Sequence, residues 1–346
     1  MEKILSIIIP TYNMEKYLNK CLNSLIVPDS NTMKHIEVLV IIDGATDQSS
    51  KIAHAYQNEY PDTFRVIDKK NGNYGSCINC GLKVANGKYV KILDADDYFQ
   101  TNNFNKFLYI LQEQDVDLII TNFDYVNVDD KIIEQKHRNL PKNQTLDFSK
   151  AVSDFNTNLI SMHELTYKTD ILRSISYHQT EGISYTDLEW CFMPMTKVKT
   201  LVYFDIVLYK YLIGRADQTV APDVALKMLP HKMKSGINMA LQYEKITDLD
   251  IEHMSYINRR ISWSLGAIYY NYLITYNKCL PLEELIKFDC AIQEKAPNVY
   301  KLLSEEILNP KLHIKYIAYW RSNKYKIPLI LKLSQCFISI YQKTKK

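Results

Sequence analysis

The chain of 346 residues is predicted to be an α/β protein, with a mainly parallel central sheet flanked by helices and a helical C-terminal module. Two patterns predict this class. Apolar, β-branched runs alternate with helical periodicity over the first hundred residues, and only helical periodicity remains beyond Pro222. Hydrophobic residues make up 47% of the chain, which is enough for a full core. We therefore expect two domains, residues 1–222 and 223–346.

The first strand is predicted from the β-branched run at residues 4–9, which suits a strand buried on both faces. Pro10 closes the run, so the chain leaves the sheet at Thr11 and Tyr12. The alternation continues with a helix over 14–26, a strand over 36–42 that ends at Asp43, a helix from Asp47 to Tyr60, a strand over 64–67, a helix over 75–85 and a strand over 89–93.

Three carboxylates follow that last strand, in the segment Asp94-Ala95-Asp96-Asp97. Such a cluster repels itself unless a cation, water or a helix terminus offsets its charge, and hard oxygen ligands suit Mg²⁺ or Mn²⁺. A strand-to-helix turn with Asp caps is the alternative reading. In a parallel sheet the carboxyl ends of the strands lie at one edge, so Thr11, Asp43 and the acidic cluster should converge on one crevice.

Strands are also expected at 117–121, 123–128 and 163–168, before the helical module. The predicted helices of that module span 224–246, 251–276, 282–293 and 298–308.

Five motifs follow one another in the first hundred residues: Ile7 to Asn13, Val40 to Asp47, Asn71 to Ser76 with Asn79 and Gly81, Gly87-Lys88-Tyr89, and Asp94 to Asp97. In order and spacing they resemble the motifs of family 2 glycosyltransferases. The resemblance implies a GT-A fold that binds a nucleotide sugar, with inversion at the anomeric carbon.

The resemblance also implies roles for individual residues. Pro10 and Thr11 would lie beside the nucleotide base, and Asp43 would accept a hydrogen bond from uracil N3. Asp94 would lie near the ribose or the donor sugar, and Asp96 would hold the divalent metal that bridges the diphosphate. Further donor-binding residues implied by the same motifs are Tyr12, Asn73, Gly75, Asn79 and Ala95.

Two positions depart from the family pattern. The family often has two acids before the glycine of the second motif, and this chain has Ile42 in place of the first. It also often has Arg where this chain has Ile78. The contact of Asp43 with uracil survives the first change, whereas the second removes a basic contact to phosphate.

A candidate general base lies in the segment from Thr180 to Trp190, which resembles the acidic pair that opens a helix in this family. Asp187 is the candidate base, because an inverting transfer needs one carboxylate to take the acceptor's proton. A carboxylate stabilised by a helix N-terminus is the other reading. Glu189 is the second choice as base, or a residue of the solvated face.

Arg215 belongs to a segment similar to the family's late arginine motif, Tyr211 to Val220. By that resemblance Arg215 would approach the diphosphate or the acceptor. A surface ion pair with Asp217 is the competing interpretation.

The charge of the chain is unevenly distributed. The formal net charge is +3, but residues 311–346 contain nine Lys or Arg and no Asp or Glu, so the rest is mildly acidic. This basic, amphipathic tail predicts peripheral contact with an anionic membrane, and an ordinary packed terminal helix is the alternative. Three roles remain open for the helical module: packing on the catalytic domain, shaping the acceptor site or forming a homodimer contact. We expect no nucleic-acid partner.

Seven scattered cysteines and a start without a signal-peptide pattern predict a cytoplasmic chain, acting at the inner face of the plasma membrane if the tail binds lipid. Cys77 and Cys80 fit the C-x-x-C spacing, but they lie on a predicted helix, and we expect no redox or metal role for them.

The predicted function is a metal-dependent inverting glycosyltransferase, a hexosyl- or N-acetylhexosaminyltransferase that uses a UDP-sugar and Mn²⁺ or Mg²⁺. Its acceptor would be a glycan or lipid-linked hydroxyl in bacterial capsular, exopolysaccharide or cell-wall glycan synthesis. Two alternatives remain, a catalytically silent nucleotide-sugar-binding or scaffold subunit and a sugar-phosphate nucleotidyltransferase. The latter usually has a Gly-rich basic loop after its first strand, which Thr11 to Glu15 lack.

Overall fold

The computed structural model describes residues 2–215, 218, 222–275, 280–308, 313–333 and 335. The chain forms two compact units, Met1–Met228 and Leu229–Lys346. The sequence analysis places the boundary earlier, after residue 222. Helix α9 (Pro222–Lys227) accounts for the difference, because it begins at that proline and belongs to the first unit.

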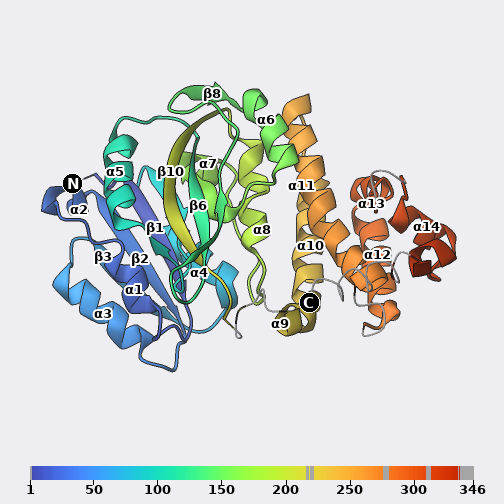
Figure 1. Ribbon diagram of the computed structural model, residues 1–346, viewed down its shortest axis with the longest axis horizontal. Coiled ribbons are helices and arrows are strands. Elements are labelled where there is room, and N and C mark those ends of the chain that lie inside the picture. Colours follow the sequence, from blue (N-terminus) through green and yellow to red (C-terminus); the bar gives the residue numbers. More distant parts are fainter. Residues whose placement is uncertain are drawn as a thin grey trace. The chain divides into compact units, whose positions relative to one another are not determined.

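A ten-stranded sheet forms the centre of the first unit, and its main path runs β3-β2-β1-β4-β9-β6-β10-β5 (Figure 1). Strands β1 to β3 and β4 pair in parallel, and β6 pairs in parallel with β10. Strand β9 lies antiparallel between β4 and β6, so these two also share one direction. The predicted fold class is therefore confirmed, since the long strands mostly point the same way. The strands are β1 (Leu5–Thr11), β2 (Ile36–Asp43), β3 (Phe64–Lys69), β4 (Tyr89–Ile92), β5 (Tyr98–Phe99), β6 (Leu118–Val126), β7 (Ile132–Lys136), β8 (Thr145–Asp147), β9 (Leu165–Lys168) and β10 (Thr200–Leu212).

The helices of the first unit are shorter than the sequence predicts in some places. The segment 14–26 contains only α1 (Leu18–Asn23), because residues 14–17 form a turn in which Met14 accepts from the amides of Tyr17 and Leu18. The remaining helices are α2 (Ser30–Lys34), α3 (Ser49–Glu59), α4 (Asn73–Val84), α5 (Thr101–Gln112), α6 (Phe148–Thr157), α7 (Thr169–Ser174) and α8 (Asp187–Trp190), with 3₁₀ turns at Met162–Glu164 and Met193–Thr196.

The two strands predicted at 117–121 and 123–128 are one strand, β6. Asn122 does not interrupt it, because the buried Asn122 side chain donates to Asp205 at 2.7 Å and accepts from the Tyr203 hydroxyl at 2.9 Å. Both partners lie on β10, a strand of thirteen residues that the sequence analysis does not predict. The polar residue therefore joins two neighbouring strands.

The second unit is helical, as predicted. It contains α10 (Leu229–Tyr243), α11 (Ile251–Tyr270), a π-helical turn (Asn271–Thr275), α12 (Leu282–Lys295), α13 (Pro297–Leu303) and α14 (Tyr316–Ser322). The predicted helix 224–246 is interrupted at Met228, and the one predicted over 298–308 ends at Leu303. Tyr276, the predicted end of 251–276, lies outside the described residues.

Helix α14 carries the described part of the basic tail. Its Tyr316 hydroxyl donates to the Gly266 carbonyl at 2.8 Å, and Arg321 forms a buried ion pair with Asp289 at 2.6 Å. These contacts are those of an ordinary packed helix. Residues 309–312, at the start of the tail and just before it, and residues 336–346 lie outside the described residues. Within the described ranges, no helix is both long and apolar enough to cross a bilayer.

A buried ion pair stabilises the part of the first unit that precedes β9. Arg138 donates to both carboxylate oxygens of Glu164, at 2.5 and 2.6 Å, and lies 3.1 Å from Asp154. All three side chains are at most 7% exposed. The carboxylate of Glu164 also accepts from the Ser161 amide, which fixes the turn at Met162–Glu164.

We expect Arg138→Met to lower the free energy of unfolding by about 3 kcal/mol, because removal of one partner leaves buried carboxylates uncompensated. Urea unfolding would measure this. The control is Lys142→Met, which removes an exposed partner of Asp205 and should barely move the midpoint. Equal effects of the two variants would contradict the expectation.

Candidate functional site

The site lies at the carboxyl ends of β1, β2 and β4. The register pairs Thr11 with Ile42 and Ile8 with Ile92, so these strand ends share one edge of the sheet. A cavity of about 370 Å³ opens there, and we call it the strand-end cavity. Its lining includes five of the predicted donor-binding residues, Pro10, Thr11, Tyr12, Asp43 and Asn73, together with Met14, Asn71, Tyr74, Cys77 and Ser184.

Asp43 is fixed in the wall of this cavity. Its carboxylate is buried and accepts from the Lys69 ammonium at 2.6 Å and from the Gly72 amide at 2.9 Å. Its main-chain carbonyl accepts from the Asn71 side chain at 2.9 Å. The segment after β3 therefore holds Asp43 in one orientation, and Lys69 supplies a positive charge there. The sequence analysis missed Lys69.

The acidic cluster is largely enclosed. Asp97 is 1% exposed and accepts from the Tyr209 hydroxyl and the Leu212 amide, both at 2.7 Å. Asp94 accepts from the Tyr74 hydroxyl at 2.8 Å. Burial and the charge of Asp96 raise the pKa of Asp94 to about 7, and Asp187 adds to the effect. Burial and the charges of Asp96 and Asp94 raise the pKa of Asp97 well above its usual range.

The arrangement fits a divalent cation. Among the described residues, Asp94, Asp97 and His163 each offer a ligand atom within 4.8 Å of the others. Burial and nearby Lys91 lower the pKa of His163 to about 3, so its imidazole is neutral, as a metal ligand must be. The pKa values of Asp94 and Asp97 are raised because buried carboxylates lie close to one another, and a bound cation would offset their repulsion. His163 was not predicted, because it is distant in sequence.

Asp96, the predicted metal ligand, has a different partner. Its carboxylate forms an ion pair with the Arg215 guanidinium at 2.5 Å, and Arg215 also lies over the Tyr17 ring at 4.5 Å from the ring centroid. Both side chains are mostly buried, at 15% and 6% exposure. The structure thus brings together Asp96 and Arg215, which are 119 residues apart. Asp217, the alternative partner of Arg215, lies outside the described residues.

Asp187 begins the short helix α8 and lies near the acidic cluster. Its charge contributes to the raised pKa of Asp94, and it adds to the effect of burial in raising the pKa of Tyr185 to about 12. Glu189, the second candidate base, is 1% exposed, and its carboxylate accepts from the Thr180 amide at 2.9 Å. Glu189 therefore anchors the loop before α8, whereas Asp187 is half-buried.

Asn79 and Gly75 of α4 position that same loop. The Asn79 amide group donates to the Gln179 carbonyl at 2.9 Å, and its oxygen accepts from the Gln179 amide at 2.8 Å. A Cβ on Gly75 would lie 2.1 Å from the Thr180 carbonyl oxygen, so only glycine allows this approach. Ala95 is 2% exposed and belongs to the core. Donor contacts of Asn79, Gly75 and Ala95 stay predictions.

Aromatic residues that the sequence analysis did not assign to the site form one of its walls. Tyr211 stacks on His163 with 4.4 Å between ring centroids, and Tyr209 meets the same ring edge-on at 4.7 Å. Both come from β10, whose alternation of tyrosines is the sequence signal that could have indicated a strand with one site-facing side.

Lys91 of β4 is fully buried and lies three residues before Asp94 in the sequence. Its ammonium donates to the carbonyls of His163 and Leu165 at 2.8 and 3.2 Å. Burial lowers its pKa to about 7. Between that value and the ordinary 10.5, the unfolded chain binds one proton more than the folded chain. The stability that depends on a neutral Lys91 is therefore fully present above pH 10.5, and it is lost as the pH falls through about 7.

Between about pH 7 and 10.5, the titration of Lys91 should raise the free energy of unfolding by up to about 1.4 kcal/mol per pH unit. The substitution Lys91→Met should remove this dependence on pH. Urea unfolding at pH 7, 8 and 9 would measure the slope. Lys106→Met, at an exposed position of α5, should keep the slope of the unmodified chain. The same slope in both variants would contradict the expectation.

The C-x-x-C pair lies on α4. Cys77 is buried, and burial raises the pKa of its thiol to about 12, so it is not a thiolate. The cysteines of the described ranges form no disulfide. The absence of a redox role for this pair stays a prediction.

The fold of the chain is that of GT-A glycosyltransferases. It matches the crystal structure of S. aureus TarS 1-349 in complex with UDP-GlcNAc with a TM-score of 0.63 at 18% identity, over 99% of this chain and 92% of that one. The same protein in complex with UDP matches with a TM-score of 0.57 at 18% identity, over the same shares of the two chains. The predicted fold is thereby confirmed.

Residues 6–173 match the model of glycosyl transferase family 2, which supports the predicted resemblance to this family. The uncharacterized glycosyltransferase alr2836 of Nostoc sp. is 31% identical over 138 residues, which cover 40% of this chain and 42% of that protein. Glycosyltransferase GlyG of Streptococcus pneumoniae is 33% identical over 131 residues, 38% of this chain and 42% of that protein. The uncharacterized glycosyltransferase YibD of Escherichia coli K12 is 26% identical over 253 residues, 71% of this chain and 69% of that protein. The match thus spans about two fifths of the first two relatives.

Proposed function

We propose that the protein is an inverting glycosyltransferase that transfers a hexosyl or N-acetylhexosaminyl group from a UDP-sugar to a hydroxyl group of a glycan or lipid-linked acceptor. One observation carries the proposal. A carboxylate at the start of α8, Asp187, lies near enough to Asp94 of the acidic cluster to raise its pKa, and a neighbouring cavity is lined by five of the predicted donor-binding residues. The match to the family 2 model supports the reaction class.

The donor would lie with its uracil in the strand-end cavity. The fixed carboxylate of Asp43 would accept from uracil N3, between Pro10, Thr11 and Tyr12 on one side and Asn73 on the other. The complexes of TarS with UDP-GlcNAc and with UDP support a UDP-sugar as the donor class.

Asp187 would act as the general base. In the transfer, the acceptor oxygen forms a bond to the anomeric carbon, and its proton passes to the Asp187 carboxylate. The bond from the anomeric carbon to the diphosphate oxygen breaks, and its electron pair leaves with UDP. Attack from the face opposite the leaving group inverts the configuration. The site requires no covalent intermediate, so one carboxylate is sufficient.

Mn²⁺ or Mg²⁺ would be held by Asp96, with Asp94 and His163 beside it. A bound divalent cation would supply positive charge at the departing diphosphate. In the ligand-free chain the Arg215 guanidinium supplies the positive charge at Asp96. Arg215 would then contact the diphosphate, and Lys69, which is paired with Asp43, would add positive charge at the strand-end cavity.

A calorimetric screen of UDP-sugars with and without Mn²⁺, followed by turnover of the best ligand, tests the proposal. We expect metal-dependent binding of one donor and release of UDP in the presence of acceptor. Binding without any turnover would instead favour the silent subunit. Reaction of a sugar phosphate with UTP, with no transfer from any UDP-sugar, would favour the nucleotidyltransferase.

We also propose that the acceptor belongs to bacterial capsular, exopolysaccharide or cell-wall glycan synthesis, and that the enzyme acts in the cytoplasm at the inner membrane face. The basic tail from residue 311 supports a peripheral contact. Sedimentation with anionic vesicles at low and high salt tests it. Equal supernatant fractions with and without anionic lipid would refute the membrane contact. Light scattering would test the predicted homodimer.

A further inference from the structure

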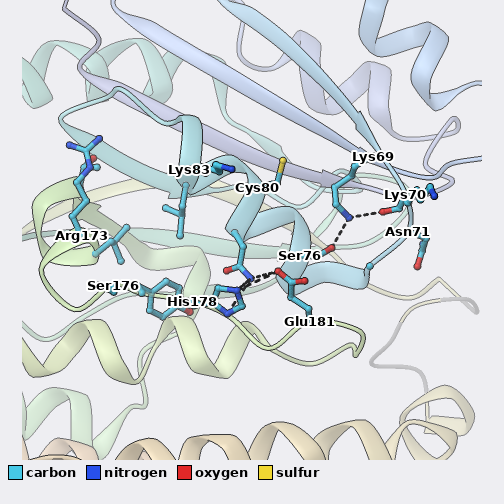
Figure 2. A pocket seen from close by; sticks show the side chains of 16 residues that line it. Lys69, Lys70, Asn71, Ser76, Cys80, Lys83, Arg173, Ser176, His178 and Glu181 are labelled. Carbon is cyan, nitrogen blue, oxygen red and sulfur yellow. Dashed lines mark hydrogen bonds and ion pairs between the residues drawn. The ribbon is translucent and has the colours of Figure 1, made fainter.

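A second cavity, larger than the strand-end cavity, lies along the outer face of α4. It has a volume of about 900 Å³, and its walls come from the end of β3, α4, α7 and the segment after α7 (Figure 2). We call it the α4 groove. Gly72 and Lys83, eleven residues apart, both line it, so it follows the helix for about 16 Å at 1.5 Å per residue. Asn71 lines both this groove and the strand-end cavity, so the two are neighbours.

The groove is lined by more basic than acidic side chains. Lys69 and Lys70 lie at one end and Arg173 at the other in Figure 2, and Lys83 lies between them. Glu181 is the acid in the lining. Lys69 is already paired with Asp43.

The remaining cations of the groove are accessible to a ligand. Lys70 and Lys83 are exposed, and neither pairs with a carboxylate within the described ranges. Arg173 is 61% exposed, donates to the Ala85 carbonyl at 3.1 Å and lies 3.7 Å from exposed Asp170. Such distant, solvated neighbours leave most of the positive charge available to a ligand.

The floor of the groove is apolar. Leu82 and Leu172 contribute aliphatic surface, and Tyr177 contributes an aromatic ring that packs edge-on against Trp190 at 5.5 Å. An apolar floor with an aromatic ring suits the faces of sugar rings, and separated cations at the rim suit phosphate or carboxylate groups. A neutral oligosaccharide would leave these cations without a partner. A single small anion would leave the floor uncovered.

The loop before α8 forms part of the wall of the groove. His178 and Glu181 line the groove between its two ends in Figure 2, and the Asn79 side chain, also in the lining, donates to Glu181 at 2.8 Å and to the Gln179 carbonyl at 2.9 Å. The next residue, Thr180, donates to Glu189 in α8, the helix that Asp187 begins. A chain lying in the groove would therefore pass beside the loop that leads to the candidate base.

We propose that the α4 groove binds an anionic, phosphate- or carboxylate-bearing segment of the acceptor glycan, remote from the hydroxyl that reacts. This inference rests on the proposed function, because it assigns the chemical class of the acceptor for that same site. The segment lies along α4, with its acidic groups at Lys70, Lys83 and Arg173. The donor occupies the separate strand-end cavity, so both ligands bind at once.

The experiment uses the full chain saturated with UDP, so that the strand-end cavity is filled. The probes are short-chain inorganic polyphosphate for phosphate and oligogalacturonate for carboxylate, with a neutral cello-oligosaccharide for comparison, and calorimetry gives each Kd. The test variant is K83E/R173E. Its matched control is K51E/K106E, which reverses two exposed lysines on α3 and α5 and changes the net charge equally.

We expect the unmodified chain to bind both anionic probes and to bind the neutral oligosaccharide at least tenfold more weakly. K83E/R173E should weaken the anionic probes about tenfold and leave the Kd of UDP within twofold, and K51E/K106E should match the unmodified chain. An equal loss in K51E/K106E would overturn the proposal, because the overall field would then explain the binding. Unchanged binding in K83E/R173E would overturn it too.

Two further outcomes separate this inference from others. Groove-dependent binding of phosphatidylglycerol vesicles without binding of either soluble probe would overturn it in favour of a lipid surface. If the screen of UDP-sugars finds no donor while K83E/R173E alone weakens the anionic probes, the groove binds anions and the proposed transferase function fails. A fold check by circular dichroism accompanies each variant, and K83Q with R173Q gives the same comparison should K83E/R173E not fold.

Discussion

Asp187→Asn should lower the turnover of the donor by about a thousand-fold, within the range that a positioned general base contributes. The amide has the shape of the carboxylate but cannot accept the proton of the acceptor hydroxyl. Because Asp187 lies near the acidic cluster and does not line the strand-end cavity, the Kd of UDP should stay within twofold. Steady-state kinetics at saturating donor and calorimetry with UDP measure the two quantities.

The matched control for Asp187 is Asp170→Asn. Asp170 is also a carboxylate in the first turn of a helix, α7, and it is exposed. If Asp187 served only as a carboxylate at a helix N-terminus, the two variants would lose similar amounts of stability, and the turnover of both would change little. Turnover of the Asp187 variant within tenfold of the unmodified chain would refute its role as base.

Asp96→Asn should abolish the effect of Mn²⁺ on UDP binding and weaken that binding at least tenfold in the presence of the metal. An amide oxygen is a poorer ligand than a carboxylate for a hard divalent cation, and the variant also loses the charge that Arg215 now balances. Calorimetry of UDP at several Mn²⁺ concentrations measures the linkage, and electron paramagnetic resonance counts bound Mn²⁺ without any turnover.

Asp129→Asn, at an exposed position in the turn before β7, controls for the change in net charge and should keep the Mn²⁺ effect. Suppose that the Asp96 variant keeps the effect of Mn²⁺ on UDP binding and that Asp94→Asn loses it. The metal ligands would then be Asp94, Asp97 and His163, and not Asp96. That result would correct the role assigned by family resemblance.

The first half of the fold follows from the sequence because its strands are buried on both faces. Continuous apolar runs such as Ile4 to Ile9 have one good solution, a central strand, and Pro10 marks where it ends. Strand β10 is less apparent, since it carries Asp205 and Lys210 among its apolar residues and pairs with the distant strands β5, β6 and β8. Pairing between distant segments decides that strand, and its alternating tyrosines are a weaker local signal than a continuous apolar run.

The candidate site was predictable to the extent that its residues lie at strand ends. Asp43 and the acidic cluster could be placed on one edge from the order of the strands alone. The pair between Asp96 and Arg215 could not, because it joins residues from opposite parts of the unit. Nor could the roles of Asn79 and Glu189, since which polar group faces the site and which anchors a loop depends on tertiary contacts.

The close approach of Gly75 to the Thr180 carbonyl has a consequence for chimeric enzymes. Helix α4 and the loop over 178–181 are complementary surfaces, joined by that approach and by the paired hydrogen bonds of Asn79 with Gln179. A loop transplanted from a relative to alter acceptor preference would not be complementary to α4, because the side chains of α4 fit the native loop. Exchange of the loop should therefore yield working chimeras only when the matching turn of the helix is carried over with it.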